Sequence, residues 1–286
     1  MTAPVYHAPA TLEEALALLG ACGDEAAIVA GGQEVVPLLT AGRIAPRMLV
    51  DLRRLDALTG ITEEPDTLRL GARVTHREIA SSPVVRGRWS LLTQAAAAIG
   101  GGVQVLNRGT LGGALCAAHP AYDYAPCLVA LQAVVVLASA RGRRSLPVQT
   151  FFTGAGRTAR RPDELLLEVR IPAPPPPTTA AYRKLRAVWG GPGVVNAACL
   201  VRREGDRLVD IRLTVGAVEE TPVVVSLDHL RGAPPDAVPE RAAEAAQDLV
   251  RHPIEDAAAG AAYRRAMAGV MARRAVAAAL TARESP

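Results

Sequence analysis

Residues 104–114 read Gln104-Val-Leu-Asn-Arg-Gly109-Thr110-Leu-Gly112-Gly113-Ala114, and Cys116-Ala-Ala-His119-Pro120-Ala-Tyr122-Asp123 follows after one further residue. Three glycines within five positions leave one face of the backbone free of side chains, and the hydroxyl of Thr110 lies among them. A concave run of uncovered backbone N–H groups suits an anion, most often a phosphate. The stretch therefore predicts an anion-binding loop, followed by a helix over residues 122–131 with Asp123 at its start.

A second glycine pair lies earlier, in Ile28-Val-Ala30-Gly31-Gly32-Gln33-Glu34, where an apolar strand expected over residues 27–30 runs straight into a turn. One glycine pair alone more often makes an ordinary tight turn than a ligand-binding loop. Neither run has the Rossmann or P-loop spacing, and neither carries a P-loop lysine. The two runs are therefore informative only as a pair.

Together the two runs resemble the two pyrophosphate-binding loops of the FAD-binding medium subunits of the molybdenum hydroxylases, the family of xanthine dehydrogenase and carbon monoxide dehydrogenase. In that family the first loop is Ala-Gly-Gly followed by His or Thr and then Ser, and the second is Thr-(Ile/Leu)-Gly-Gly. Residues 30–32 and 110–113 match these motifs. The chain is identified as a member of the family because the resemblance continues through residues 6–15, 50–53, 164–172, 182–185 and 262–276.

The resemblance implies an α+β fold in two parts. Residues 1–175 would form a PCMH-type FAD-binding domain with two subdomains, and residues 179–283 a small domain like the C-terminal domain of carbon monoxide dehydrogenase flavoproteins, with a three-stranded sheet and helices. The hydrophobic pattern agrees with this second part, since it predicts strands over 180–188, 195–203 and 208–218 and amphipathic helices over 239–250 and 261–282. Five prolines within residues 172–177 predict a stiff connector between the parts.

By the same resemblance the cofactor is FAD, and its pyrophosphate lies against both glycine runs. The cofactor-binding residues that this implies are Ala30, Gly31, Gly32, Gln33, Glu34, Thr110, Leu111, Gly112, Gly113 and Ala114. Asp123 would bond the sugar chain of FAD, and Lys184 would lie near the polar edge of the flavin. No catalytic or metal-binding residue is implied, because no nucleophilic triad or metal-ligand cluster accompanies the loops.

Three positions in the loops depart from the family pattern. Gln33 replaces the usual His or Thr, Ala114 replaces an Asn or Ser, and Glu34 stands where a Ser or Thr donates a hydrogen bond near the phosphates. A carboxylate about 5 Å from a phosphate adds roughly 3 kcal/mol of repulsion per charge at an effective dielectric constant of about 20. Glu34 therefore either points at the pyrophosphate and repels it, or turns away to solvent or to an arginine.

The resemblance implies one subunit of a three-part enzyme. A molybdopterin-binding large subunit would hydroxylate a substrate, and a small subunit would carry two [2Fe–2S] clusters. The FAD of this chain would pass their electrons to an external acceptor, since the redox chemistry belongs to the cofactor. The alternative is a flavin-depleted homologue that serves as a scaffold for the partner subunits.

The composition agrees with a globular protein and excludes several other classes. Half of the 286 residues are hydrophobic, the net charge is only +4, and the basic residues are dispersed, so we expect no nucleic-acid partner. The four cysteines form no C-x-x-C pair, so we expect neither a zinc site nor an iron–sulfur cluster in this chain alone. Without a signal peptide or a long apolar run, we expect a cytoplasmic protein with no membrane partner.

Overall fold

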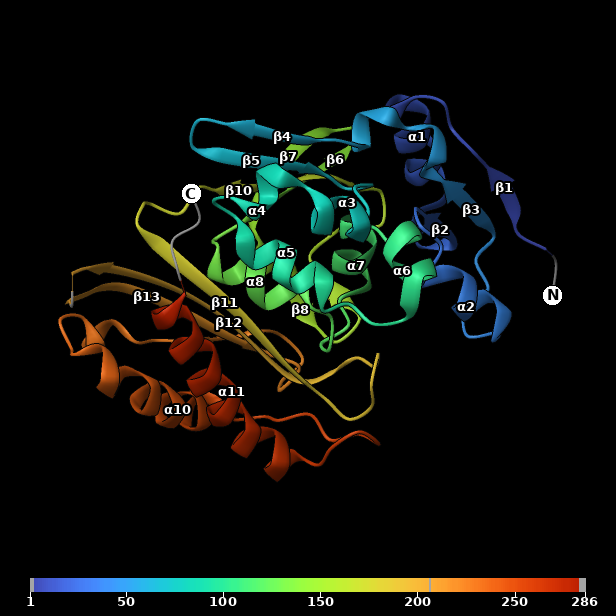
Figure 1. Ribbon diagram of the computed structural model, residues 1–286. Helices are drawn as coiled ribbons and strands as arrows, with labels where there is room; N and C mark the ends of the chain where they lie inside the picture. The colour runs from blue at the N-terminus through green and yellow to red at the C-terminus, as the bar shows by residue number, and fades with distance from the viewer. Residues whose placement is uncertain (1–2, 206, 283–286) are drawn as a thin grey trace.

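A small parallel sheet begins the chain in the computed structural model, which describes residues 3–205 and 207–282. The elements of this first subdomain are β1 (Val5–His7), α1 (Leu12–Cys22), β2 (Ala26–Val29), α2 (Val35–Thr40) and β3 (Met48–Asp51). The strands lie in the order β1–β3–β2 (Figure 1). Helix α1 begins after Thr11, whose hydroxyl accepts a hydrogen bond from the backbone N–H of Glu14 at 3.2 Å. Strand β2 ends just before Gly31, so the sheet presents the first glycine run at the carboxyl end of a strand.

The second subdomain is an antiparallel sheet covered on one face by helices. Its strands are β4 (Ile61–Glu64), β5 (Thr67–Gly71), β6 (Val134–Ser139), β7 (Gly142–Pro147) and β10 (Leu165–Pro172), in the order β4–β5–β10–β6–β7. Its helices are α3 (His76–Ser81), α4 (Pro83–Arg86), α5 (Ser90–Ala97), α6 (Gly102–Arg108), α7 (Leu111–Ala117), α8 (Tyr124–Ala130) and α9 (Val148–Phe151). A two-stranded ribbon of β8 (Phe152–Gly154) and β9 (Arg157–Thr158) follows α9.

The C-terminal part is an antiparallel sheet backed by two long helices. Its strands lie in sequence order: β11 (Thr178–Arg186), β12 (Gly193–Glu204), β13 (Arg207–Gly216) and β14 (Val223–Val225). The helices are α10 (Val238–Leu249) and α11 (Ala261–Thr281), close to the predicted bounds. Short 3₁₀ turns complete the chain at Gly23–Glu25, Leu52–Arg54, Asp56–Leu58, Asp228–Leu230 and Pro235–Ala237. Among the described residues no helix combines the length and the apolar character needed to cross a membrane.

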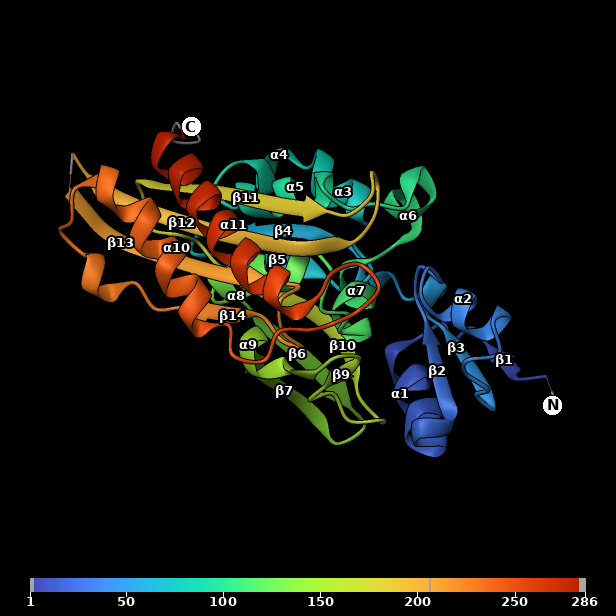
Figure 2. The same ribbon diagram turned by 90° about the horizontal axis from the view of Figure 1, so that it is seen from below.

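These units stack in layers because several strands bury both of their faces. On β12, Cys199 and Val201 belong to a core shared with α10 and α11, while Ala198 and Leu200 belong to the core of the second subdomain. Helices α5 and α8 lie between the five-stranded sheet and the C-terminal sheet (Figure 1). A third, smaller core lies under α1 and joins the N-terminal sheet to β6 and β10. Figure 2 shows the N-terminal sheet set to one side, away from α10 and α11.

The architecture confirms the predicted α+β fold with a two-subdomain first part, and two details differ from the sequence-based expectation. The C-terminal sheet has a fourth strand, β14, which is only three residues long and pairs with β13 through Val223–Val225. The central glycine-rich stretch is largely helical rather than a loop, because it contains α6 and α7. Thr110 is the N-cap of α7, so the glycines that follow it lie inside the first turn of a helix.

Candidate functional site

The two glycine runs, which are far apart in the sequence, are in direct contact. A side chain on Gly31 would overlap the backbone carbonyl of Arg108 and lie 3.1 Å from the Cα of Gly109. Gly109 is in turn packed on the ring of the buried His76, and its carbonyl accepts a hydrogen bond from the His76 backbone N–H at 3.1 Å. Only glycine fits at these positions, and the lack of side chains there allows the two runs to approach so closely.

The first run offers free backbone donors. Two of its carbonyls are occupied, since Gly32 and Glu34 accept hydrogen bonds from the N–H groups of Val36 and Leu38 at the start of α2. The N–H groups of residues 31–34, in contrast, donate to no acceptor within residues 3–205 and 207–282. Gly32 has a φ of 72°, a left-handed conformation of the kind that occurs in anion-binding turns of the backbone. This run therefore has the donor chemistry that a phosphate needs.

The second run does not offer the bare N–H groups that its sequence predicted. The N–H groups of Leu111 and Gly112 donate to the carbonyls of Val74 and Ala72, and that of Gly113 donates to the hydroxyl of Thr110 at 3.1 Å. The prediction of an open amide loop is therefore wrong here, because the run begins a helix whose first N–H groups are used by the carbonyls of Val74 and Ala72 and by the Thr110 cap. One feature of an open surface is present, since a side chain on Gly113 would approach no atom within 4 Å except the Thr110 hydroxyl. Ala114, at the next position, is half-buried.

Glu34 forms a hydrogen bond that the sequence reading did not foresee. The hydroxyl of Tyr122, 88 positions later in the chain, donates to its Oε2 atom at 2.6 Å. The Tyr122 ring also stacks on His119, with ring centroids 4.9 Å apart. Burial and the neighbouring Glu34 carboxylate raise the pKa of the Tyr122 phenol, so the phenol stays a donor at physiological pH. Glu34 thus turns neither to solvent nor to an arginine, and Tyr122 is a site residue that only its position beside Asp123 could have suggested.

Asp123 and Lys184 meet at the seam between the second subdomain and the C-terminal sheet. The Lys184 Nζ lies 2.8 Å from Asp123 Oδ1 and also donates to the backbone carbonyl of Ala98 at 3.1 Å. The hydroxyl of Tyr182 donates to the same carboxylate at 2.6 Å. Burial raises the pKa of Asp123 and lowers that of Lys184, and the charge of each partner opposes the shift in the other. A carboxylate has about four acceptor positions, so Asp123 can still accept a hydrogen bond from a ligand hydroxyl.

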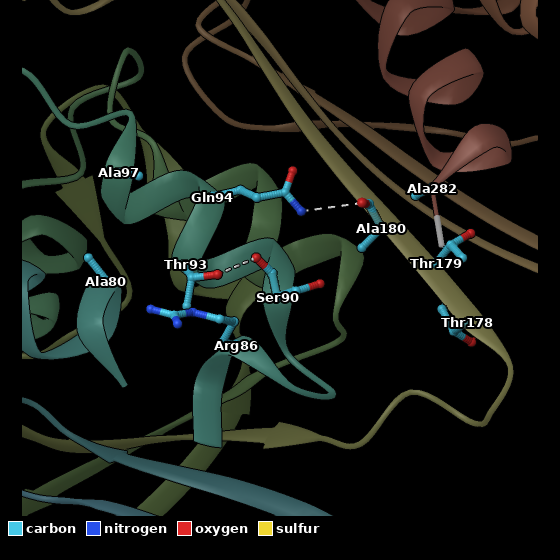
Figure 3. Close-up of a pocket in the computed structure, with 10 residues that line it drawn as sticks. All are labelled: Ala80, Arg86, Ser90, Thr93, Gln94, Ala97, Thr178, Thr179, Ala180 and Ala282. Carbon is cyan, nitrogen blue, oxygen red and sulfur yellow. Dashed lines mark hydrogen bonds between the residues drawn. The ribbon is translucent and has the colours of Figure 1, made fainter. Parts of the chain in front are cut away.

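A cavity lies elsewhere, between α5 and β11. Its volume is about 480 Å³, and its lining includes Arg86, Ser90 and Thr93 (Figure 3). Gln94 joins its two walls, since its Nε2 atom donates to the Ala180 carbonyl at 3.2 Å and its Oε1 atom accepts from the Tyr182 N–H at 2.9 Å. None of the residues predicted to bind the cofactor lines this cavity, so it belongs to the seam between the domains and not to the junction of the glycine runs.

Comparison with known proteins first defines the class of protein. Residues 1–174 match the family model of the FAD binding domain in molybdopterin dehydrogenase, and residues 176–279 match that of the CO dehydrogenase flavoprotein C-terminal domain. The chain is therefore an FAD-binding oxidoreductase subunit with two family domains.

Individual relatives match most of the chain. The carbon monoxide dehydrogenase medium chain of Hydrogenophaga pseudoflava is 36% identical over 276 residues, which cover 95% of each chain. The caffeine dehydrogenase subunit beta of a Pseudomonas species is 35% identical over 78% of this chain and 75% of that one. A solved structure of the H. pseudoflava carbon monoxide dehydrogenase superimposes with a TM-score of 0.92 at 35% identity over 97% of both chains. The chain belongs to the family of FAD-binding medium subunits of the molybdenum hydroxylases, which confirms the resemblance drawn from its glycine runs.

Proposed function

We propose that this chain holds FAD across the junction of its two glycine runs and transfers electrons from the [2Fe–2S] clusters of a small partner subunit to an external acceptor. A large partner subunit with molybdopterin would supply those electrons by hydroxylating a substrate. The observation that carries the proposal is the contact of Gly31 with Arg108 and Gly109, beside backbone donors that are free in the described chain. Similar proteins carry the names of medium chains and subunits, which supports a heteromeric complex.

Each predicted site residue has a role in this proposal. The backbone N–H groups at Gly31, Gly32, Gln33 and Glu34 would bind the pyrophosphate, while Ala30 connects them to the end of strand β2. Thr110, Leu111, Gly112, Gly113 and Ala114 would form the opposite wall through the open surface at Gly113. Asp123 would accept a hydrogen bond from the sugar chain, and Lys184 would place a positive charge near the flavin. FAD supplies the redox chemistry when bound, and these residues bind and orient it.

The proposal extends to the domain limits and the compartment. We assign the FAD-binding role to residues 1–175 and a supporting role to residues 179–283, whose Lys184 and Tyr182 reach Asp123 in the first part. We also propose a cytoplasmic location. Its support is that the four cysteines, Cys22, Cys116, Cys127 and Cys199, are free, as is usual in a reducing compartment.

Reconstitution of the purified chain tests the cofactor role directly. The apoprotein is titrated with FAD while quenching of the flavin fluorescence is followed, and the loaded protein is then precipitated with acid. We expect one FAD per chain, released entirely into the supernatant because no covalent attachment is proposed. A yellow pellet would contradict non-covalent binding, and the absence of saturable FAD binding would contradict the proposed function.

The flavin-depleted scaffold remains a second candidate because of the hydrogen bond between Glu34 and Tyr122. This bond places a carboxylate and a phenol beside the free donors of the first run, where the family resemblance leads us to expect Ser or Thr. A scaffold would still assemble with both partner subunits but would contain no flavin. Co-purification of the complex followed by flavin extraction separates the two functions, since only the electron-transfer subunit yields FAD in proportion to assembled complex.

A further inference from the structure

The hydrogen bond between Glu34 and Tyr122 joins the two ends of the proposed cofactor site. Glu34 directly follows the free donors at residues 31–33, and Tyr122 directly precedes Asp123. A ligand that contacts both these donors and Asp123 would therefore lie next to both side chains. The bond of 2.6 Å ties these two side chains together.

Hydrogen bonds hold the backbone around Tyr122, so rotation of the two side chains is the simplest way for the bridge to open. The Tyr122 N–H donates to the His119 carbonyl at 3.0 Å, which closes a turn over residues 119–122. This turn is tied to the C-terminal sheet, because the carbonyl of Pro120 accepts from the N–H of Ala217 at 3.1 Å and that of Ala121 accepts from the N–H of Gly193 at 3.4 Å. A rotation of the Tyr122 or Glu34 side chain needs no change in this framework.

The bond also holds a negative charge in place. The Glu34 carboxylate is half-buried, and within the described ranges Tyr122 is the partner that its side chain contacts by a hydrogen bond. A hydrogen bond to an ionised carboxylate is stronger than one between neutral groups. The bond therefore holds the Glu34 carboxylate beside the free backbone donors of residues 31–33, to which we assign the diphosphate.

We propose that Glu34 and Tyr122 form a latch that keeps the cofactor cleft of the FAD-free chain closed, and that FAD binds only after this hydrogen bond breaks. The proposal rests on the proposed function and adds a regulation of the same site. Because the binding-competent state is only a fraction of the free chain, the latch lowers both the apparent affinity for FAD and its rate of association.

Tyr122→Phe is the direct test, since it removes the hydrogen bond and keeps the ring. The full-length apoprotein is mixed with FAD or with riboflavin in a stopped-flow instrument, and the association rate is read from fluorescence quenching. We expect the variant to bind both flavins about ten- to a hundredfold faster, the factor that one hydrogen bond to a charged group represents. Tyr263→Phe is the matched control: this tyrosine is half exposed on α11 and should leave both rates unchanged.

Glu34→Gln distinguishes the effect of the hydrogen bond on flavin binding from the effect of the negative charge. The amide oxygen still accepts a weaker, neutral hydrogen bond, so riboflavin should bind only a few times faster. FAD should gain at least tenfold more than riboflavin, since the variant also removes the repulsion of the diphosphate. This second variant keeps the test decisive if Tyr122→Phe disturbs folding, which thermal unfolding of each variant will report.

The outcomes are distinct. Faster binding of both flavins by Tyr122→Phe supports the latch, including the case in which wild type binds no FAD and the variant does. Wild-type rates for both flavins in Tyr122→Phe and for riboflavin in Glu34→Gln overturn the latch while the proposed function stands. If neither wild type nor any variant binds FAD, the proposed function fails and the latch fails with it.

Discussion

Asp123 and Lys184 form an ion pair across the two domains, with Nζ 2.8 Å from Oδ1 and only 6% and 3% of the two side chains exposed. Because the Tyr182 hydroxyl and the Ala98 carbonyl also bond the pair, each charge is well satisfied. A buried pair of this kind contributes little when compared with an apolar replacement, but loss of one partner leaves the other charge buried and unpaired. The contact between the two domains therefore depends on both residues of the pair.

Removal of one charge should destabilise the chain far more than removal of both. We expect Lys184→Met to lower the free energy of unfolding by about 3–5 kcal/mol, and the double variant Lys184→Met/Asp123→Leu to recover much of that loss. Urea unfolding of the apoprotein measures both. As a control, Arg273→Met removes an exposed pair with Glu240 and should cost no more than about 1 kcal/mol. An equal loss in the single and double variants would contradict the prediction.

The buried His76 should give the chain an acid-sensitive stability. Burial lowers its pKa from 6.5 to about 4, so the folded state binds its proton less readily than the unfolded state does. The stability that neutral His76 contributes is fully present above about pH 6.5 and is lost as the pH falls to about 4. This loss lowers the free energy of unfolding by roughly 3 kcal/mol. When urea unfolding is measured across this pH range, the free energy of unfolding of His76→Gln should fall less steeply toward acid pH than that of wild type. Parallel curves for the two proteins would mean that other groups carry the acid sensitivity.

The two adjacent glycines of α7 should respond differently to alanine. A Cβ on Gly112 would lie 2.8 Å from the Cβ and carbonyl of Ala72, so Gly112→Ala should destabilise the fold by about 1–3 kcal/mol. A Cβ on Gly113 meets only the Thr110 hydroxyl, at 2.9 Å, and the fold should tolerate it. We expect Gly113→Ala to weaken FAD binding instead, since the methyl group occupies the open surface. Unchanged FAD affinity in this variant would show that the cofactor does not approach α7 there.

Arg264 should be essential for the stability of the C-terminal part. Its Nη1 atom donates to the carbonyls of Val194 and Ala217 at 2.6 and 2.7 Å, and its Nη2 atom pairs with Asp256 at 2.6 Å. A lysine cannot reproduce this planar set of donors, so Arg264→Lys should lower the unfolding free energy by about 2–3 kcal/mol. Arg274→Lys, on the exposed face of α11, is the matched control for thermal unfolding and should match wild type.

The sequence was sufficient for the features that depend on local pattern. Residues 238–249 and 261–281 carry a regular apolar face, and the strand periodicity of residues 178–216 places alternate side chains in two different cores, so these elements could be predicted almost to their ends. The resemblance placed both glycine runs against one pyrophosphate, and the contact of Gly31 with Arg108 brings the two runs together.

Two features could not be predicted because they depend on tertiary contacts. Glycine is a poor helix former, so the helix over residues 111–117 is not evident from its sequence. It forms because Thr110 caps it and because Val74 and Ala72 accept the first N–H groups. The bond between Glu34 and Tyr122 joins residues 88 positions apart, and nothing in either local sequence requires it.

Strand β12 has a consequence for how this chain is inherited. Its alternate residues, Ala198 and Leu200 on one side and Cys199 and Val201 on the other, complete the interiors of both family domains. A recombination event that cut the gene near the proline-rich connector would leave each fragment with a bare apolar face, which favours aggregation. We therefore expect the two domains to be encoded together in one gene, and to be encoded separately only where a new partner covers the exposed sheet.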